Sequence, residues 1–102
     1  MNTYLECCIA QCKEKEAALL ADGRGDEAVF EKIRANVFGI FQTVWNTGRG
    51  EAFFREKLTQ IPAAWQAALE KARAHGDEKA VCLETIKLEA VREIEARLEG
   101  QP

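Results

Sequence analysis

Serine is absent from the 102-residue chain, and histidine occurs only once, as His75. The first absence excludes a serine nucleophile, and the second leaves one imidazole for acid–base chemistry. No run of about 18 apolar residues occurs, so no membrane-spanning helix is expected. Acidic residues outnumber basic ones by 17 to 14, which argues against a surface that neutralises nucleic-acid phosphates. We therefore expect neither a membrane nor a nucleic acid as a partner.

The amino terminus lacks the basic segment and apolar run of a signal peptide. A soluble cytoplasmic protein is the resulting expectation, and its four cysteines are then expected to be free thiols. Hydrophobic residues make up 47% of the chain and charged residues 30%, which suits a packed core with a solvated exterior. The length predicts one domain, over residues 1–102.

Apolar residues recur with the period of an α-helix, and no segment alternates as a β-strand does. This pattern predicts an all-α bundle of four to five helices. The second stretch is apolar over about half its circumference, so it is either the central helix or a helix that meets a partner. Pro62 lacks an amide donor, which predicts a break or kink in the third stretch. The expected helices span residues 3–21, 26–46, 50–60, 62–75 and 78–99.

Apolar side chains beyond the needs of one core are the main indication of function. Val81 and Leu88 lie one heptad apart on the last helix, away from its core stripe. Such a surplus favours a protein–protein or self-association surface, as in a homodimer, although some apolar side chains are exposed in every protein. The interface candidates are Phe38, Trp45, Phe53, Val81 and Leu88.

Two charged residues, Glu16 and Arg34, interrupt apolar helical stripes. An unpaired buried charge is costly, so each must reach solvent or a partner. One interpretation places both at the edge of their stripes, where they extend into water. The other pairs Glu16 with Arg34 across the first two helices and so fixes the helix register.

Cysteines offer the alternative site. Cys8 and Cys12 lie one turn apart, and with Cys82 or His75 they present ligands of a type that binds zinc. The spacing matches no zinc or redox signature, and the same two cysteines fit an apolar stripe. We therefore favour no metal, no cofactor and no catalytic residue. The leading hypothesis is a non-enzymatic helical interaction module, and the alternative is a cysteine-based metal-binding or redox-sensing protein.

A likeness covers residues 26–89. It rests on Asp26-Glu27 with Phe30-Glu31-Lys32-Ile33, on Ile61-Pro62 with Trp65, on His75-Gly76-Asp77, and on Glu84-Thr85-Ile86-Lys87-Leu88-Glu89. In these segments the chain resembles small all-helical bacterial proteins of unknown function. The resemblance implies a compact bacterial helical domain and carries no activity with it.

Overall fold

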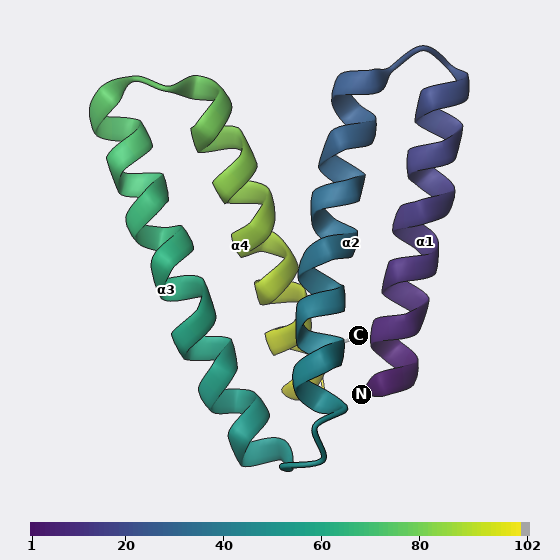
Figure 1. Cartoon of the computed structure of the whole chain (residues 1–102), viewed down its shortest axis with the longest axis vertical. Helices are drawn as coiled ribbons and strands as arrows, with labels where there is room; N and C mark the ends of the chain where they lie inside the picture. The colour runs from purple at the N-terminus through teal and green to yellow at the C-terminus, as the bar shows by residue number, and fades with distance from the viewer. Residues whose placement is uncertain (101–102) are drawn as a thin grey trace.

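The computed structural model describes residues 1–100, and Gln101 and Pro102 of the expected domain lie outside the described residues. It contains four helices and, within those residues, no strand. The all-helical prediction is confirmed. None of these helices combines the length and the apolar character needed to cross a membrane. The helices are α1 (Asn2–Ala21), α2 (Gly25–Trp45), α3 (Glu51–His75) and α4 (Glu78–Leu98) (Figure 1).

The helix ends follow the local chemistry of the sequence. Helix α3 ends at Gly76, whose positive φ of 67° is the left-handed conformation that glycine adopts without strain. Asp77 then caps α4, because its Oδ1 accepts a 3.1 Å hydrogen bond from the amide of Ala80. Helix α2 starts at Gly25, one residue before the expected position, so Asp26 lies in its first turn. There the negative carboxylate of Asp26 interacts favourably with the positive end of the helix dipole.

Pro62 lies inside α3, which continues without a break from Glu51 to His75. The version with separate helices over 50–60 and 62–75 is therefore wrong, and the four-helix version holds. Proline removes only one amide donor from the helix, and its ring is buried in this structure, so packing offsets part of the cost. A kink at Pro62 stays a prediction.

The four helices form two antiparallel hairpins, α1–α2 and α3–α4, arranged as a V (Figure 1). At one end, called the closed end here, the hairpins meet near the loop 46–50 and the first residues of α1. At the other, the open end, the turns 22–24 and 76–77 lie apart. Helix α2 packs against each of the other three helices, which supports its expected central position.

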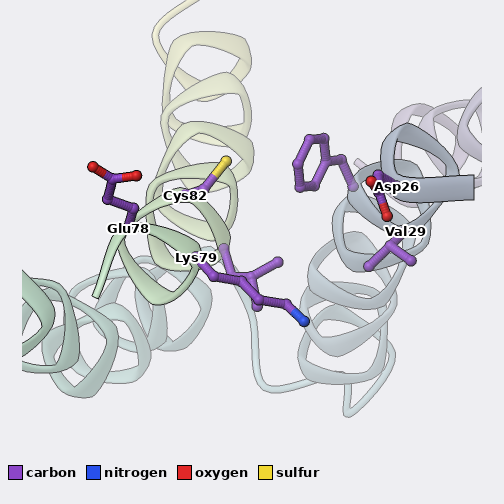
Figure 2. A pocket seen from close by; sticks show the side chains of 7 residues that line it. Asp26, Val29, Glu78, Lys79 and Cys82 are labelled. Carbon is purple, nitrogen blue, oxygen red and sulfur yellow. The ribbon is translucent and has the colours of Figure 1, made fainter. Parts of the chain in front are cut away.

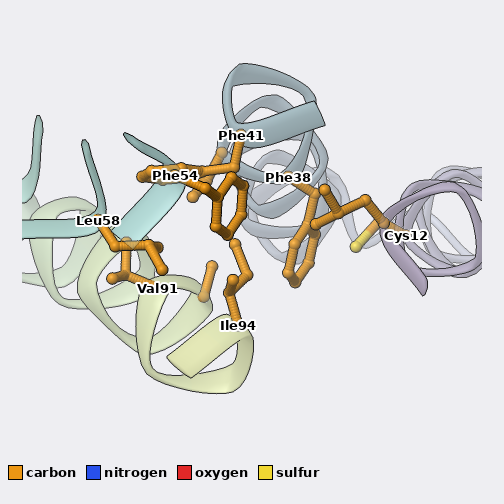
Figure 3. Packing of buried hydrophobic residues seen from close by; sticks show 10 residues of the cluster. Cys12, Phe38, Phe41, Phe54, Leu58, Val91 and Ile94 are labelled. Atoms are coloured by element: carbon orange, nitrogen blue, oxygen red, sulfur yellow. The ribbon is translucent and has the colours of Figure 1, made fainter. Parts of the chain in front are cut away.

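The hydrophobic core lies at the closed end (Figure 3). Phe54 of α3 makes edge-on contacts with two aromatic rings of α2, at a centroid distance of 5.9 Å to Phe41 and 5.2 Å to Trp45. Edge-to-face pairs of this kind add stabilisation beyond the burial of their area. The largest fully buried side chains come from all four helices and are Leu5, Val37, Phe38, Phe41, Phe54 and Ile94.

Candidate functional site

A groove of about 510 Å³ separates the first half of α2 from the first half of α4 at the open end. Figure 2 shows Asp26 and Val29 on α2 and Glu78, Lys79 and Cys82 on α4, with the Lys79 side chain extending across the groove toward α2. Apolar walls with a few charged groups are typical of ligand and partner sites. The lining residues are Asp26, Val29, Phe30, Glu78, Lys79, Cys82 and Leu83. We call this site the α2–α4 groove.

The apolar side of α2 continues beyond the groove. Val29, Ile33 and Ile40 follow one another at intervals of four and seven residues, which places them on one side of the helix. Val29 is 48% exposed and Ile40 is 40% exposed. The sequence left open whether the wide apolar face of this helix is buried within the chain or meets a partner, and Val29 and Ile40 belong to the part of that face that is exposed. No helix of the same chain covers either side chain. The hairpins diverge at the level of Val29, whereas Ile40 lies next to Phe41 in the closed-end half of α2, on the outside of that helix.

Phe38 and Leu88 are wrong as interface candidates. Phe38 is 0% exposed and lies in the core, while Leu88 is 8% exposed. The expectation treated each helix as buried along one stripe. Helix α2 packs against three helices, and α4 packs against α2 and α3 and also contacts Tyr4 of α1, so each buries more of its circumference than one stripe. Both side chains are unavailable to a partner while the chain is folded.

The other three interface candidates are half-buried. Trp45 packs edge-on against Phe54 at the closed end. Phe53 lies between two cations, with its ring centroid 5.0 Å from the Arg49 guanidinium carbon and 5.3 Å from Lys57 Nζ. Val81 lies on α4, and its carbonyl accepts the hydroxyl of Thr85. None of the three lines the α2–α4 groove, so the structure does not join them into one surface with it.

Arg34 makes its ion pairs with residues other than Glu16. One guanidinium nitrogen lies 2.8 Å from a carboxylate oxygen of Glu93 on α4, and Nε lies 3.5 Å from Glu31 on α2. The pairing of Glu16 with Arg34, one of the two interpretations of the sequence, is absent from the ion pairs of residues 1–100, because Arg34 extends toward α4. Burial acts to lower the pKa of Arg34, but hydrogen bonding and the charge of Glu93 outweigh it and raise that pKa. Arg34 thus ties the two hairpins together at the point where they separate.

Two of the four cysteines lie beside this ion pair. Cys12 is buried and Cys8 is half-buried, and burial raises the pKa of both thiols. Burial likewise raises the pKa of Tyr4, whose hydroxyl donates to the carbonyl of Glu93 at 3.3 Å. Protonated thiols are poor nucleophiles and poor metal ligands, so this placement favours a packing role for Cys8 and Cys12.

The remaining members of the expected cysteine site lie elsewhere. Cys82 lines the α2–α4 groove, and Nδ1 of His75 lies 2.8 Å from the carbonyl oxygen of Lys71 near the end of α3. Within residues 1–100, no three side chains of His, Cys, Asp or Glu form a group that is able to hold a metal ion. The structure therefore does not bring the alternative ligands together.

Sequence reasoning missed the α2–α4 groove as a site, although it identified surplus apolar surface in general. The hydrophobic pattern of Val29, Phe30 and Leu83 is that of ordinary core positions. These three residues line a groove only because the two hairpins diverge, and the sequence does not reveal that divergence. No family of proteins matches the chain, and the comparisons with curated proteins and with solved structures gave no match either.

Proposed function

We propose that this chain is a non-enzymatic helical interaction module that binds an apolar helix of a protein partner in the α2–α4 groove. The observation that carries the proposal is the apolar wall of the groove, in which Val29 of α2 is 48% exposed across from Cys82 and Leu83 of α4. Burial of such surface stabilises a complex by about 25 cal/mol per Å².

The form of the groove suits a helix. Its walls are themselves two helices that diverge, and a further helix between them would complete a packed bundle. Asp26 and Glu78 are two carboxylates against the one ammonium of Lys79 among the lining residues, so a helix with cationic flanks would be preferred. A helix-in-groove complex is a common mode of peptide recognition.

A synthetic helix tests the proposal without knowledge of a natural partner. The probe is a fluorescent amphipathic peptide of leucine and lysine, and its anisotropy is followed as the protein is added. We expect saturable binding, and we expect Val29→Lys to weaken it by about tenfold, because the variant loses one apolar contact and adds a like charge.

The matched control is Ala67→Lys, which adds the same charge to an exposed position of α3 away from the groove. It should leave the affinity for the peptide unchanged. Binding that responds equally to both variants would mean that the peptide recognises net charge, and the proposal would then fail. Absence of binding would also contradict it.

A further inference from the structure

We infer that the natural occupant of the α2–α4 groove is a second copy of this chain, which inserts the second half of its own α2. The inference rests on the proposed function and names its partner. In the resulting dimer, Ile40 of each copy would enter the groove of the other between Val29 and Leu83.

The first argument is charge. Residues 35–48 contain no Asp, Glu, Lys or Arg, although 30% of the whole chain is charged. A helix segment without charges enters an apolar groove without the desolvation cost of an ion. On the outside of this segment Asn36, Ile40 and Thr43 are exposed. The groove needs such a segment, and the chain itself supplies one.

The second argument comes from the other helices. The exposed face of α4 carries charged residues along its length, and that of α1 carries them at Glu6 and at residues 13–15. Helix α3 has an uncharged exposed stretch over residues 59–67, but its exposed side chains are only Thr, Gln and Ala. Among residues 1–100 the exposed large apolar side chains are Leu20, Val29 and Ile40. Val29 lines the groove, Leu20 lies on a short uncharged stretch over residues 17–21 at the end of α1, and Ile40 lies within the longer uncharged segment 35–48.

The direction of α2 supports a two-fold axis. The charged residues of α2 lie in its first half, from Asp26 to Arg34. A parallel pairing of two α2 helices would place each of these charges beside the identical charge of the other copy. An antiparallel pairing sets the charged half of one helix beside the uncharged half of the other, with Val29 at the level of the partner copy's Ile40. It also aligns the two helix dipoles favourably. The same surface then serves both copies, as a two-fold interface requires.

A stable dimer has to bury more surface than the outer face of α2 offers, so the groove must belong to the interface as well. The face of α2 from Val29 to Thr43 is about 21 Å long and about 10 Å wide, or roughly 210 Å². Stable interfaces bury about 800 Å² on each partner. Contact between two α2 faces alone is therefore too small, whereas insertion into the groove adds the wall of α4. The interface would consist of α2 and α4 from both copies.

Sedimentation equilibrium over a dilution series tests this dimer. We expect the mass of the wild-type chain to rise with concentration from the monomer value of 11.4 kDa toward twice that value. Ile40→Glu should weaken the dimer by at least ~100-fold, because a carboxylate would have to enter the groove. Its circular dichroism should match the wild type, because the side chain is already exposed in one copy. Ala67→Glu on α3 is the matched control and should leave the dimer unchanged.

Cross-linking checks the arrangement. In a Cys7→Ala background, Ile40→Cys should be joined to Cys82 of another copy by a short bismaleimide, whereas Ala67→Cys should not. A dimer that persists in Ile40→Glu would overturn the inference, as would a wild-type chain that is monomeric throughout. A monomer that still binds the leucine–lysine peptide would leave the proposed function standing, and a monomer that does not bind the peptide would remove both.

Discussion

The two ends of this molecule have similar apolar sequences, but their apolar side chains differ in burial. At the closed end Phe41, Phe54 and Ile94 are fully buried among residues from all four helices. At the open end Val29 lies on the same helix as Phe41 and is 48% exposed. The difference comes from the angle between the hairpins. Burial therefore depends on where the hairpins meet, and the hydrophobic pattern of a single helix does not reveal it.

The boundary between the two ends is polar. Arg34 extends from α2 to Glu93 of α4, and its guanidinium carbon lies 5.5 Å from the centre of the Phe38 ring. On both helices the groove residues, 26–30 of α2 and 78–83 of α4, precede this ion pair along the chain. This ion pair holds the hairpins at the point of divergence.

The largest expected effect is in the core of the closed end. Phe41→Ala should lower the free energy of unfolding by about 3–5 kcal/mol, because it leaves a cavity beside Phe54. Phe30→Ala, at the half-buried groove wall of the same helix, should cost less than ~2 kcal/mol. Urea unfolding of dilute protein, followed by circular dichroism, measures both. Equal costs would show that the two ends are packed alike and would break the comparison.

A smaller effect is expected at the boundary. Arg34→Met should lower the free energy of unfolding by about 1–2 kcal/mol, because Glu31, whose side chain is 17% exposed, loses its cation. Glu16→Gln should change it by less than ~0.5 kcal/mol, since Glu16 lies in none of the ion pairs of residues 1–100. A coupling energy between Glu16 and Arg34 in a double-mutant cycle would contradict this account and would support the alternative ion pair between those two residues.

Gly39 offers a stabilising change on the central helix. An added Cβ would meet nothing within 4 Å, and the residue lies within α2. Gly39→Ala should therefore raise the free energy of unfolding by about 0.5–1 kcal/mol in dilute solution. Gly76→Ala is the control with the opposite sign, because its φ of +67° is strained for alanine. Thermal unfolding of both variants measures the contrast, and destabilisation by Gly39→Ala would mean that the site is more crowded than the structure has it.

The smallest effect is expected from alkaline pH. Burial raises the pKa of the Cys8 and Cys12 thiols above their ordinary value of 9.0, so the unfolded chain loses these protons first. Stability should be fully retained below pH 9 and should fall as the pH rises above it. Urea unfolding at a series of pH values checks this, and Cys12→Ala should reduce the slope.

The same burial should divide the thiols by reactivity. With Ellman's reagent at pH 8, exposed Cys7 and Cys82 should react in a fast phase, and Cys8 and Cys12 in a slow one. Mass spectrometry of the labelled peptides identifies the phases. A fast reaction of Cys12 would contradict the packing role that we assign to it.

Much of the fold, including most helix bounds, could be predicted from the sequence. The helical period, the glycine turns and the cap at Asp77 place three of the four helices within two residues of their ends. Pro62 does not break α3, because a single lost hydrogen bond is weaker than the burial on both sides of it, and a kink there stays a prediction. The site was harder to predict from the sequence, because Phe38 and Leu88 are buried, Val29 is exposed where the hairpins diverge, and Ile40 is exposed on the outside of α2. Arg34 was recognised as a residue in need of a partner, but the choice of Glu93 required the position of α4.

Hydrogen–deuterium exchange at two protein concentrations tests the central claim most directly. The account predicts that concentration slows exchange in the outer part of α2, around residues 29–43, and in the first half of α4. The closed-end parts of α1 and α3, around Leu5 and Phe54, should exchange equally slowly in both samples. Exchange that does not change with concentration at the open end, or that slows in α3 instead, would contradict the assignment of the α2–α4 groove as an interface between two copies.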